Sequence, residues 1–215
     1  LETVFAPENS LARQNSIYSL LKSASRTLDV AQLNFETYWG GPTKKYNPVL
    51  DDSPMLKMVL AKAREGVKVR ILLNDDAVFR VREPTPKPLD LLSWISDADM
   101  FEESVAPIVF RKPLRFSEDS KAVPRDNSET IRKLTEVADR EGLDLVAKFM
   151  NFRRCGLKVL HNKGVIADSS RVLVGSLNWG ESALKFNREA GVVLSSERIA
   201  RYYDASFEHD WACSR

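Results

Sequence analysis

Hydrophobic residues follow two kinds of spacing along this chain, one typical of strands and one typical of helices. Glycines, prolines and short polar clusters separate the segments. Alternating or continuous apolar runs predict strands at Thr3–Pro7, Thr27–Phe35, Val67–Leu73, Leu143–Met150, on both sides of a turn at Asp168–Arg171, and at Glu189–Leu194. Helical spacing predicts helices from Asn9 or Ser10 to about Ser25, Asp52 or Ser53 to Gly66, Asn127 or Ser128 to Gly142, Gly180 to Leu184, and Glu197 to Trp211. A helix that ends at Gly66 and leads into a buried strand is typical of a βαβ unit. The pattern therefore predicts an α/β fold with a parallel or mixed sheet.

The regular pattern fails between Glu83 and about Arg125, where six prolines fall among scattered apolar patches. So long an irregular stretch is uncommon inside a compact domain and is usually functional or partly folded. We interpret it as an insertion at about 83–125 with one short helix from Pro88 to Ile95. It could serve as a lid, a dimer contact or a membrane-facing patch. The whole chain of 215 residues fits one domain, 1–215, that carries this insertion.

Polar side chains interrupt the apolar pattern of the predicted hairpin between His161 and Asn178. His161 and Lys163 are two positions apart, so on an extended segment both side chains leave the same face. An imidazole, an ammonium, a hydroxyl and an amide at neighbouring strand ends would suit an anionic group such as a phosphate. The simpler alternative is a surface hairpin that happens to carry polar residues.

The same stretch resembles the HKD motif of the phospholipase D superfamily, in which His-x-Lys, four residues, Asp and then Gly-Ser-x-Asn follow one another. Its positions are filled here by His161, Lys163, Asp168, Gly175, Ser176 and Asn178. Glu189 lies where many members of that family carry a further carboxylate. The resemblance implies a phospholipase D-like α-β-α sandwich, with a mixed central sheet and helices on both faces.

The resemblance also implies phosphodiester transfer through a covalent phosphohistidine. His161 would be the nucleophile, and a second copy of it the general acid. Lys163 and Asn178 would bind the non-bridging oxygens, and Glu189 would orient an imidazole. Supporting roles would fall to Ser176, Gly175 and Asp168, with Asp168 holding the turn. No metal or other cofactor is expected, because the lysines and amides of two half-sites would supply the electrostatic stabilisation.

A second copy of His-x-Lys is absent from the sequence, so the motif supplies only half of such a site. We expect either a homodimer in which two motifs meet at a twofold axis, which we favour, or one half of a two-motif protein. The missing initiating Met is compatible with the second alternative. A catalytically silent phosphate-binding or dimerisation module with the same fold is a further alternative.

Charge and aromatic residues near the motif favour a nucleic-acid substrate. The net charge is only +2, but between Asn151 and Arg188 seven cations face two anions. The loop before Asp52 carries possible substrate contacts, namely Trp39, Lys44, Lys45 and Tyr46. The aromatic residues of that loop could equally anchor it to the core. The hypothesis is therefore a nuclease, with a phospholipase, a cardiolipin-type lipid phosphodiesterase or a phosphatidyltransferase as the alternative.

The two cysteines and two histidines argue against a disulfide framework and against a metal cluster, although one disulfide bond stays open. His209 is interpreted as a surface or packing residue. No apolar run is long enough for a membrane helix, and no secretory signal is visible. The composition is that of a soluble domain, with the cytoplasm favoured and the compartment otherwise open.

Overall fold

A computed structural model describes residues 1–40, 52–75 and 127–214 of the chain. All of these residues belong to one compact unit. The insertion at about 83–125, with its short helix, lies outside the described residues.

The described residues form a seven-stranded mixed sheet in the order β1-β7-β6-β5-β2-β3-β4. The strands are β1 (Glu2–Ala6), β2 (Thr27–Gln32), β3 (Lys68–Leu73), β4 (Leu145–Phe149), β5 (Lys163–Ala167), β6 (Arg171–Gly175) and β7 (Glu189–Ser195). β2, β3 and β4 run parallel, whereas β5, β6, β7 and β1 pair antiparallel in succession from β2. The predicted mixed sheet is confirmed.

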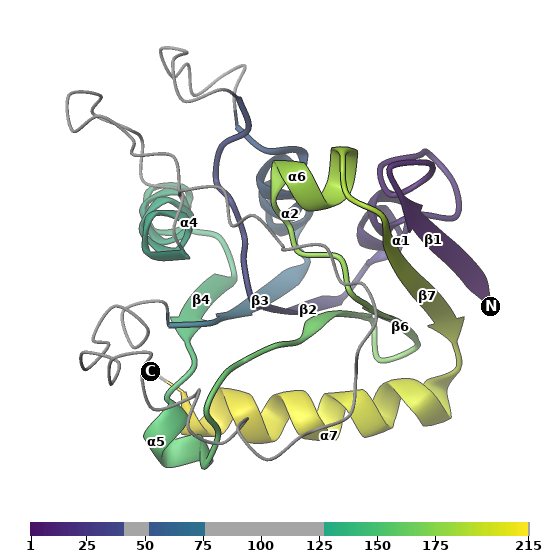
Figure 1. Ribbon diagram of the computed structural model, residues 1–215. Coiled ribbons are helices and arrows are strands. Elements are labelled where there is room, and N and C mark those ends of the chain that lie inside the picture. Colours follow the sequence, from purple (N-terminus) through teal and green to yellow (C-terminus); the bar gives the residue numbers. More distant parts are fainter. Residues whose placement is uncertain (41–51, 76–126, 215) are drawn as a thin grey trace, which may run out of the picture. The chain divides into compact units, whose positions relative to one another are not determined.

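Helices cover both faces of this sheet, as Figure 1 shows. The helices are α1 (Ile17–Ser23), α2 (Pro54–Arg64), α4 (Asn127–Glu141), α5 (Phe152–Cys155), α6 (Glu181–Lys185) and α7 (Glu197–Cys213). α1, α2 and α4 lie over one face, and α7 runs along the other with α5 at its end. The expected α-β-α sandwich is therefore confirmed.

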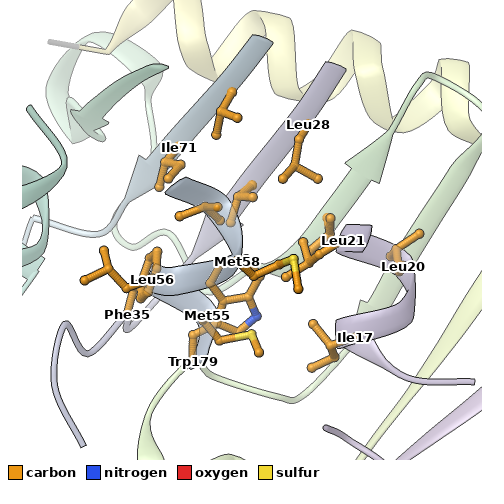
Figure 2. Close-up of a cluster of buried hydrophobic side chains, with 14 of the residues drawn as sticks. Ile17, Leu20, Leu21, Leu28, Phe35, Met55, Leu56, Met58, Ile71 and Trp179 are labelled. Carbon is orange, nitrogen blue, oxygen red and sulfur yellow. The ribbon is translucent and has the colours of Figure 1, made fainter. Parts of the chain in front are cut away.

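Alternation along the strands builds a separate apolar layer on each face of the sheet. The larger layer joins residues of α1, α2 and α4 to one side of the strands, and Figure 2 shows Trp179 and Phe35 within it. Their rings meet edge to face with centroids 4.9 Å apart. The smaller layer packs Phe207 and Ala200 of α7 against Ile166 and Val172. Because successive residues enter different layers, a polar residue in a strand can be assigned to a face.

Two element boundaries differ from the sequence-based prediction. α1 begins after Ser16, whose hydroxyl accepts from the amide of Ser19 at 2.9 Å, and not after Asn9 or Ser10. Asn9 lies instead in the preceding turn, where its side-chain amide donates to the carbonyls of Thr3 and Asn15. The Ser10 hydroxyl donates to the carbonyl of Leu184. β2 ends at Gln32 rather than Phe35, because Phe35 leaves the ladder to form a bridge with Trp179.

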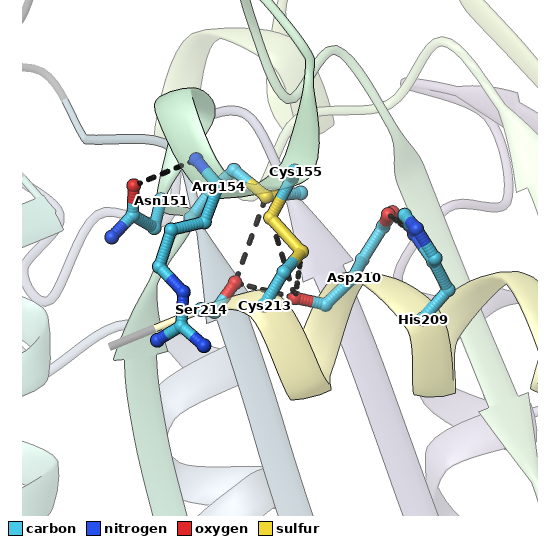
Figure 3. The surroundings of a disulfide bond; sticks show 8 residues. Asn151, Arg154, Cys155, His209, Asp210, Cys213 and Ser214 are labelled. Atoms are coloured by element: carbon cyan, nitrogen blue, oxygen red, sulfur yellow. Dashed lines mark hydrogen bonds and ion pairs between the residues drawn. A yellow bond between two sulfur atoms is a disulfide. The ribbon is translucent and has the colours of Figure 1, made fainter.

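A disulfide bond joins Cys155 of α5 to Cys213 at the end of α7, across 58 positions of sequence (Figure 3). The sequence did not exclude one disulfide bond, and the structure contains one. It ties the segment that leads into His161 to the long helix beneath the sheet. Disulfides persist mainly in oxidising compartments, so this bond weighs against the cytoplasmic expectation.

We expect the double variant Cys155→Ser/Cys213→Ser to lose about 2–4 kcal/mol of unfolding free energy, because the unfolded chain regains the freedom that the crosslink removes. Urea unfolding of the variant and of the wild type, with and without reductant, measures this loss. The reduced wild type should match the variant. An unchanged midpoint on reduction, with loss of the bond verified by mass spectrometry, would contradict the expectation.

Candidate active site

One edge of the sheet collects the polar residues of the motif. β2 ends at this edge, and β5, which is antiparallel to it, begins there with Lys163. β6 ends there at Gly175, and β7 begins there at Glu189. The antiparallel order of three successive strands therefore brings together residues that are up to 28 positions apart between His161 and Glu189.

Buried amides hold the chain where it enters this edge. The Oδ1 atom of Asn74, directly after β3, accepts from the backbone amide of Leu160 at 3.2 Å. Asn127, at the start of α4, donates from its side chain to the carbonyls of Leu33 and Asn74, both at 2.9 Å. Its Oδ1 accepts from the amide of Phe35 at 2.9 Å. The residue before His161 is thus fixed by contacts that reach three other segments.

Lys163 and His161 contact each other directly. The Lys163 Nζ atom lies 3.0 Å from His161 Nδ1, 3.2 Å from Nε2 and 2.8 Å from the carbonyl oxygen of His161. Lys163 is 6 % exposed, whereas His161 is exposed. Burial lowers the pKa of Lys163, and the charge of Glu189 partly opposes that effect. A nearly buried cation beside an accessible imidazole is suited to an anionic ligand.

Glu189 and Ser176 form a second pair at the same edge. The Ser176 hydroxyl donates to Glu189 Oε2 at 2.5 Å, and the Asn187 amide donates to Oε1 at 3.5 Å. No hydrogen bond joins Glu189 to His161 within the ranges that the structure describes. The carboxylate is therefore close enough to influence Lys163 electrostatically, while its hydrogen bonds go to the hydroxyl and amide beside it.

Asn178 follows Ser176 on the segment that leaves β6. Its Oδ1 atom is buried and has no hydrogen-bond partner among the described residues. The backbone on either side is fixed, since the amide of Trp179 donates to the carbonyl of Asn34 at 2.9 Å. The Asn178 side chain therefore follows the end of β6, where the motif residues gather, and its Oδ1 atom is an acceptor that no described residue uses.

Asp168 lies at the opposite end of the hairpin and is not brought to the site. Its carboxylate accepts from the backbone amides of Ser25, Arg26 and Thr27 at 2.7–3.2 Å. Burial raises the pKa of Asp168, but these amide donors outweigh burial and leave the pKa below its usual range. A left-handed backbone with φ of 55° completes its place in the turn. These contacts tie the hairpin to the start of β2.

The possible substrate contacts are only partly described. Trp39 is 6 % exposed, and the Nζ atom of Lys185 lies 4.9 Å from its ring centroid. Such burial agrees with the alternative in which the aromatic residue anchors the loop. Lys44, Lys45 and Tyr46 lie outside the described residues.

The six cations near the motif other than Lys163 divide into two groups. Arg171, Lys185 and Arg188 form ion pairs with acidic residues. The exposed side chains of Arg153, Arg154 and Lys158 have no acidic partner among the described residues. Lys158 stands between Leu157 and Val159, which are 41 % and 36 % exposed. This unpaired basic and apolar segment leads directly to His161.

His209, Asp210 and Cys213 form a grouping of metal-ligand type within the ranges that the structure describes. The sulfur of Cys213 is consumed by the disulfide, so it supplies no thiolate ligand. His209 is exposed on α7 and contacts Asp210 at 3.1 Å. We assign no metal to this grouping.

Sequence reasoning missed Gln32 at this edge. The sequence predicts Gln32 only as a strand residue among apolar neighbours. In the structure its side chain is fully buried, and the residue lies directly opposite Lys163 in the ladder. Its signal was available in the sequence, as a long polar side chain on the inward-facing side of an apolar strand.

This sheet, with its imidazole and buried ammonium at one edge, defines a phospholipase D-like domain. Residues 17–211 match the protein family described as cardiolipin synthase, PLD-like domain. The chain therefore belongs to this family and to the phospholipase D superfamily, and the predicted membership of that superfamily is confirmed. Among the described residues, no helix combines the length and apolarity that a membrane crossing requires.

Solved structures with the same fold cover nearly the whole chain. Nuc from Salmonella typhimurium, a phospholipase D family member, aligns with a TM-score of 0.57 and 16 % identity over 100 % of this chain and 95 % of its own. NucT from Helicobacter pylori gives a TM-score of 0.58 and 14 % identity over 99 % and 96 %. Phosphatidylserine synthase from Haemophilus influenzae gives 0.59 and 15 %, over 99 % of this chain but 39 % of its own. These similarities support the fold.

Curated relatives match over a shorter stretch. Mitochondrial cardiolipin hydrolase of Canis lupus familiaris is 31 % identical over 67 residues, which are 27 % of this chain and 26 % of that protein. The protein of the same name from Xenopus tropicalis is 36 % identical over 52 residues, 24 % and 25 % of the two chains. The similarity thus spans about a quarter of each relative.

We expect Gly175→Ala to lose about 1–3 kcal/mol of unfolding free energy, because overpacking forces the backbone apart. A Cβ at Gly175 would lie 2.6 Å from the carbonyl oxygen of Ala190 and 2.7 Å from the Cα of Gly191. Gly164→Ala is the matched control, since its Cβ would come no closer than 3.7 Å to the nearest atom. Chemical unfolding should leave the control within about 1 kcal/mol of the wild type. Equal losses in both variants would refute the close-approach explanation.

Proposed function

We propose that this protein is a phosphodiesterase that works through a covalent phosphohistidine and without a metal. The observation that carries the proposal is the contact of the nearly buried Lys163 ammonium with the accessible imidazole of His161, at 3.0 Å. The ammonium offers fixed positive charge to a phosphate, and the imidazole is a nucleophile within reach of the same phosphate.

The proposed reaction has two displacements at phosphorus. A neutral imidazole nitrogen of His161 forms a bond to phosphorus, the bond to the leaving oxygen breaks, and a protonated imidazole of a second motif gives that oxygen its proton. Water then attacks the phosphohistidine, gives its proton to the second imidazole, and the P–N bond breaks. Lys163 and Asn178 bind the non-bridging oxygens, and Glu189 orients an imidazole. Gly175 and Ser176 hold this arrangement at the strand end.

The second imidazole must come from another motif, since His209 is distant in the chain and is already engaged with Asp210. We propose that a second copy of this chain supplies it, with the two His161 residues facing across a twofold axis. The exposure of His161 supports this arrangement, because a side chain that must share a substrate with a partner cannot be enclosed by its own fold.

Single-stranded nucleic acid is the proposed substrate class. Arg153, Arg154 and Lys158 are exposed and unpaired on the segment before His161, and unpaired cations along one path suit a chain of phosphates. The buried Trp39 gives no support for base stacking on that residue. The proposal of a nucleic-acid substrate therefore rests on these exposed cations and not on aromatic stacking.

A lipid phosphodiester is a second candidate, and a specific observation favours it. Leu157 and Val159 are exposed on both sides of Lys158, next to His161. Apolar side chains interleaved with cations are suited to an anionic membrane surface. Hydrolysis or transfer of the phosphatidyl group would follow from the same intermediate.

We expect the purified protein to cleave single-stranded DNA or RNA in the presence of a chelator, and His161→Ala to abolish cleavage, a loss on the order of 10⁴-fold or more. Vesicles of cardiolipin and of phosphatidylcholine form the parallel lipid arm. Acid-labile phosphate bound to the wild type but not to His161→Ala would report the intermediate.

His209→Ala is the control, because this histidine lies outside the site and its removal should leave the rate unchanged. Cleavage that requires an added divalent metal would refute the proposed mechanism. Cleavage of lipid alone would select the second substrate class. A lack of cleavage by a dimeric protein would favour a silent phosphate-binding module.

We expect light scattering after gel filtration to report about twice the chain mass of 24.3 kDa at micromolar concentration. The physical reason is that one chain supplies one imidazole to a reaction that needs two. A strictly monomeric protein would contradict the homodimer. It would favour the alternative in which this chain is one half of a two-motif protein.

A further inference from the structure

Gln32, the last residue of β2, is a buried amide without partners. Its side chain is 0 % exposed, and neither Nε2 nor Oε1 has a hydrogen bond among the described residues. Buried polar groups are nearly always hydrogen-bonded, and an exception in a native fold calls for an explanation. Leaving a buried amide unpaired destabilises a fold, because the group loses its hydrogen bonds to water and gains none in return.

The buried amides at this edge differ in how far they are satisfied. Asn127 forms three hydrogen bonds that join Leu33, Phe35 and Asn74. Asn74 in turn accepts from the amide of Leu160. Asn178 lacks a partner at its Oδ1 atom within the described residues, whereas Gln32 lacks partners at both its side-chain nitrogen and its side-chain oxygen.

The position of Gln32 relates it directly to Lys163. The two residues are partners in the antiparallel ladder of β2 and β5, so their side chains leave the same face of the sheet. Directly opposed residues have Cβ atoms about 5 Å apart. The combined reach of the two side chains exceeds this separation, so a rotamer change can bring the ammonium to the amide oxygen.

The present contact of Lys163 creates a problem for catalysis. A charged ammonium can only donate, so a His161 nitrogen that it contacts must use its lone pair as the acceptor. The same lone pair is needed to attack phosphorus. Lys163 must therefore release the imidazole before His161 can react, and an acceptor in addition to the His161 carbonyl would hold the ammonium in its new position.

We propose that Gln32 is a positioning residue that accepts a hydrogen bond from Lys163 and holds its ammonium away from His161 and against the substrate phosphate. Gln32 thereby frees the imidazole lone pair and replaces the acceptor that Lys163 gives up. This inference rests on the proposed phosphohistidine mechanism and extends it to a residue outside the motif. The unpaired amide of the substrate-free protein is the acceptor kept available for that state.

The test compares Gln32→Met, which removes the acceptor at similar size, with Gln32→Glu, which keeps an acceptor and adds charge. The matched control is Leu28→Met, on the same strand and face and equally buried. Turnover of bis(p-nitrophenyl) phosphate is measured against pH. Titration of the Lys163 amine is followed by NMR on lysine-labelled protein saturated with sulfate, which stands in for the substrate phosphate, with Lys163→Met to assign the resonance.

We expect Gln32→Met to reduce kcat roughly 10- to 100-fold, with a smaller change in KM, because a hydrogen bond to a charged group is lost. An accepting partner stabilises protonated Lys163, so its titration should move to lower pH in Gln32→Met and to higher pH in Gln32→Glu. The alkaline limb of the rate profile should move in the same directions. Glu189 of β7 and His161 are the titratable groups that also face Lys163, and both are unchanged in the two variants.

Two outcomes would overturn the proposal. One is a Lys163 titration that is the same in Gln32→Met, Leu28→Met and the wild type. The other is a loss of activity that follows only a lower unfolding temperature, which would indicate that a bound water satisfies a structural amide. Should the wild type turn over no substrate, the proposed function fails, but the NMR titration still decides the Gln32–Lys163 contact. Should Gln32→Met not fold, the shift in Gln32→Glu decides it.

Discussion

The candidate site depends on the antiparallel ladder between β2 and β5. β2 and β3 are parallel and end at one edge of the sheet, and β5 enters the sheet from that edge with Lys163 as its first residue. A slip of one position would turn Lys163, together with His161, toward the face that α7 covers. The register is held from outside the ladder by the amide of Leu160, which donates to Asn74 Oδ1, and by the amide of Leu33, which donates to the carbonyl of Asn162 at 3.0 Å.

The second half of the motif depends on a close approach of two backbones. Gly175 of β6 faces Gly191 of β7 in the register, and a side chain at either position would collide with neighbouring atoms. This approach lets Ser176 reach Glu189 across the strands. The glycine of the motif thus has a packing role, whereas its aspartate holds the far end of the hairpin through backbone amides. Only some of the motif residues therefore meet at the site.

The elements with strong local signals were predictable from the sequence. Ser53 with Pro54 marks the start of α2, and the alternation around Val165 and Val172 marks the hairpin. The hydrogen bonds of Asn9 and the lack of a partner for Gln32 among the described residues were not predictable, because each depends on segments that the fold alone brings near. The pairing of Cys155 with Cys213 required α5 to lie at the end of α7. A motif specifies which residues act, but the orphaned amide beside it can be recognised only when burial and register are known.

The balance of charges in the proposed two-motif site supports a mechanism in which the two histidines act as a coupled pair. Each copy contributes one lysine cation and one Glu189 carboxylate, which balance each other. A bound phosphodiester adds one negative charge, and one protonated imidazole balances it. The site is therefore neutral when one imidazole is protonated and the other is not, which is the state that the displacement needs. Where a bound substrate and a second copy enclose this site, any other protonation state would leave an uncompensated charge and be disfavoured. The burial of Lys163 is thus more than a packing feature, since it links the binding of a phosphate to the protonation state of the histidines.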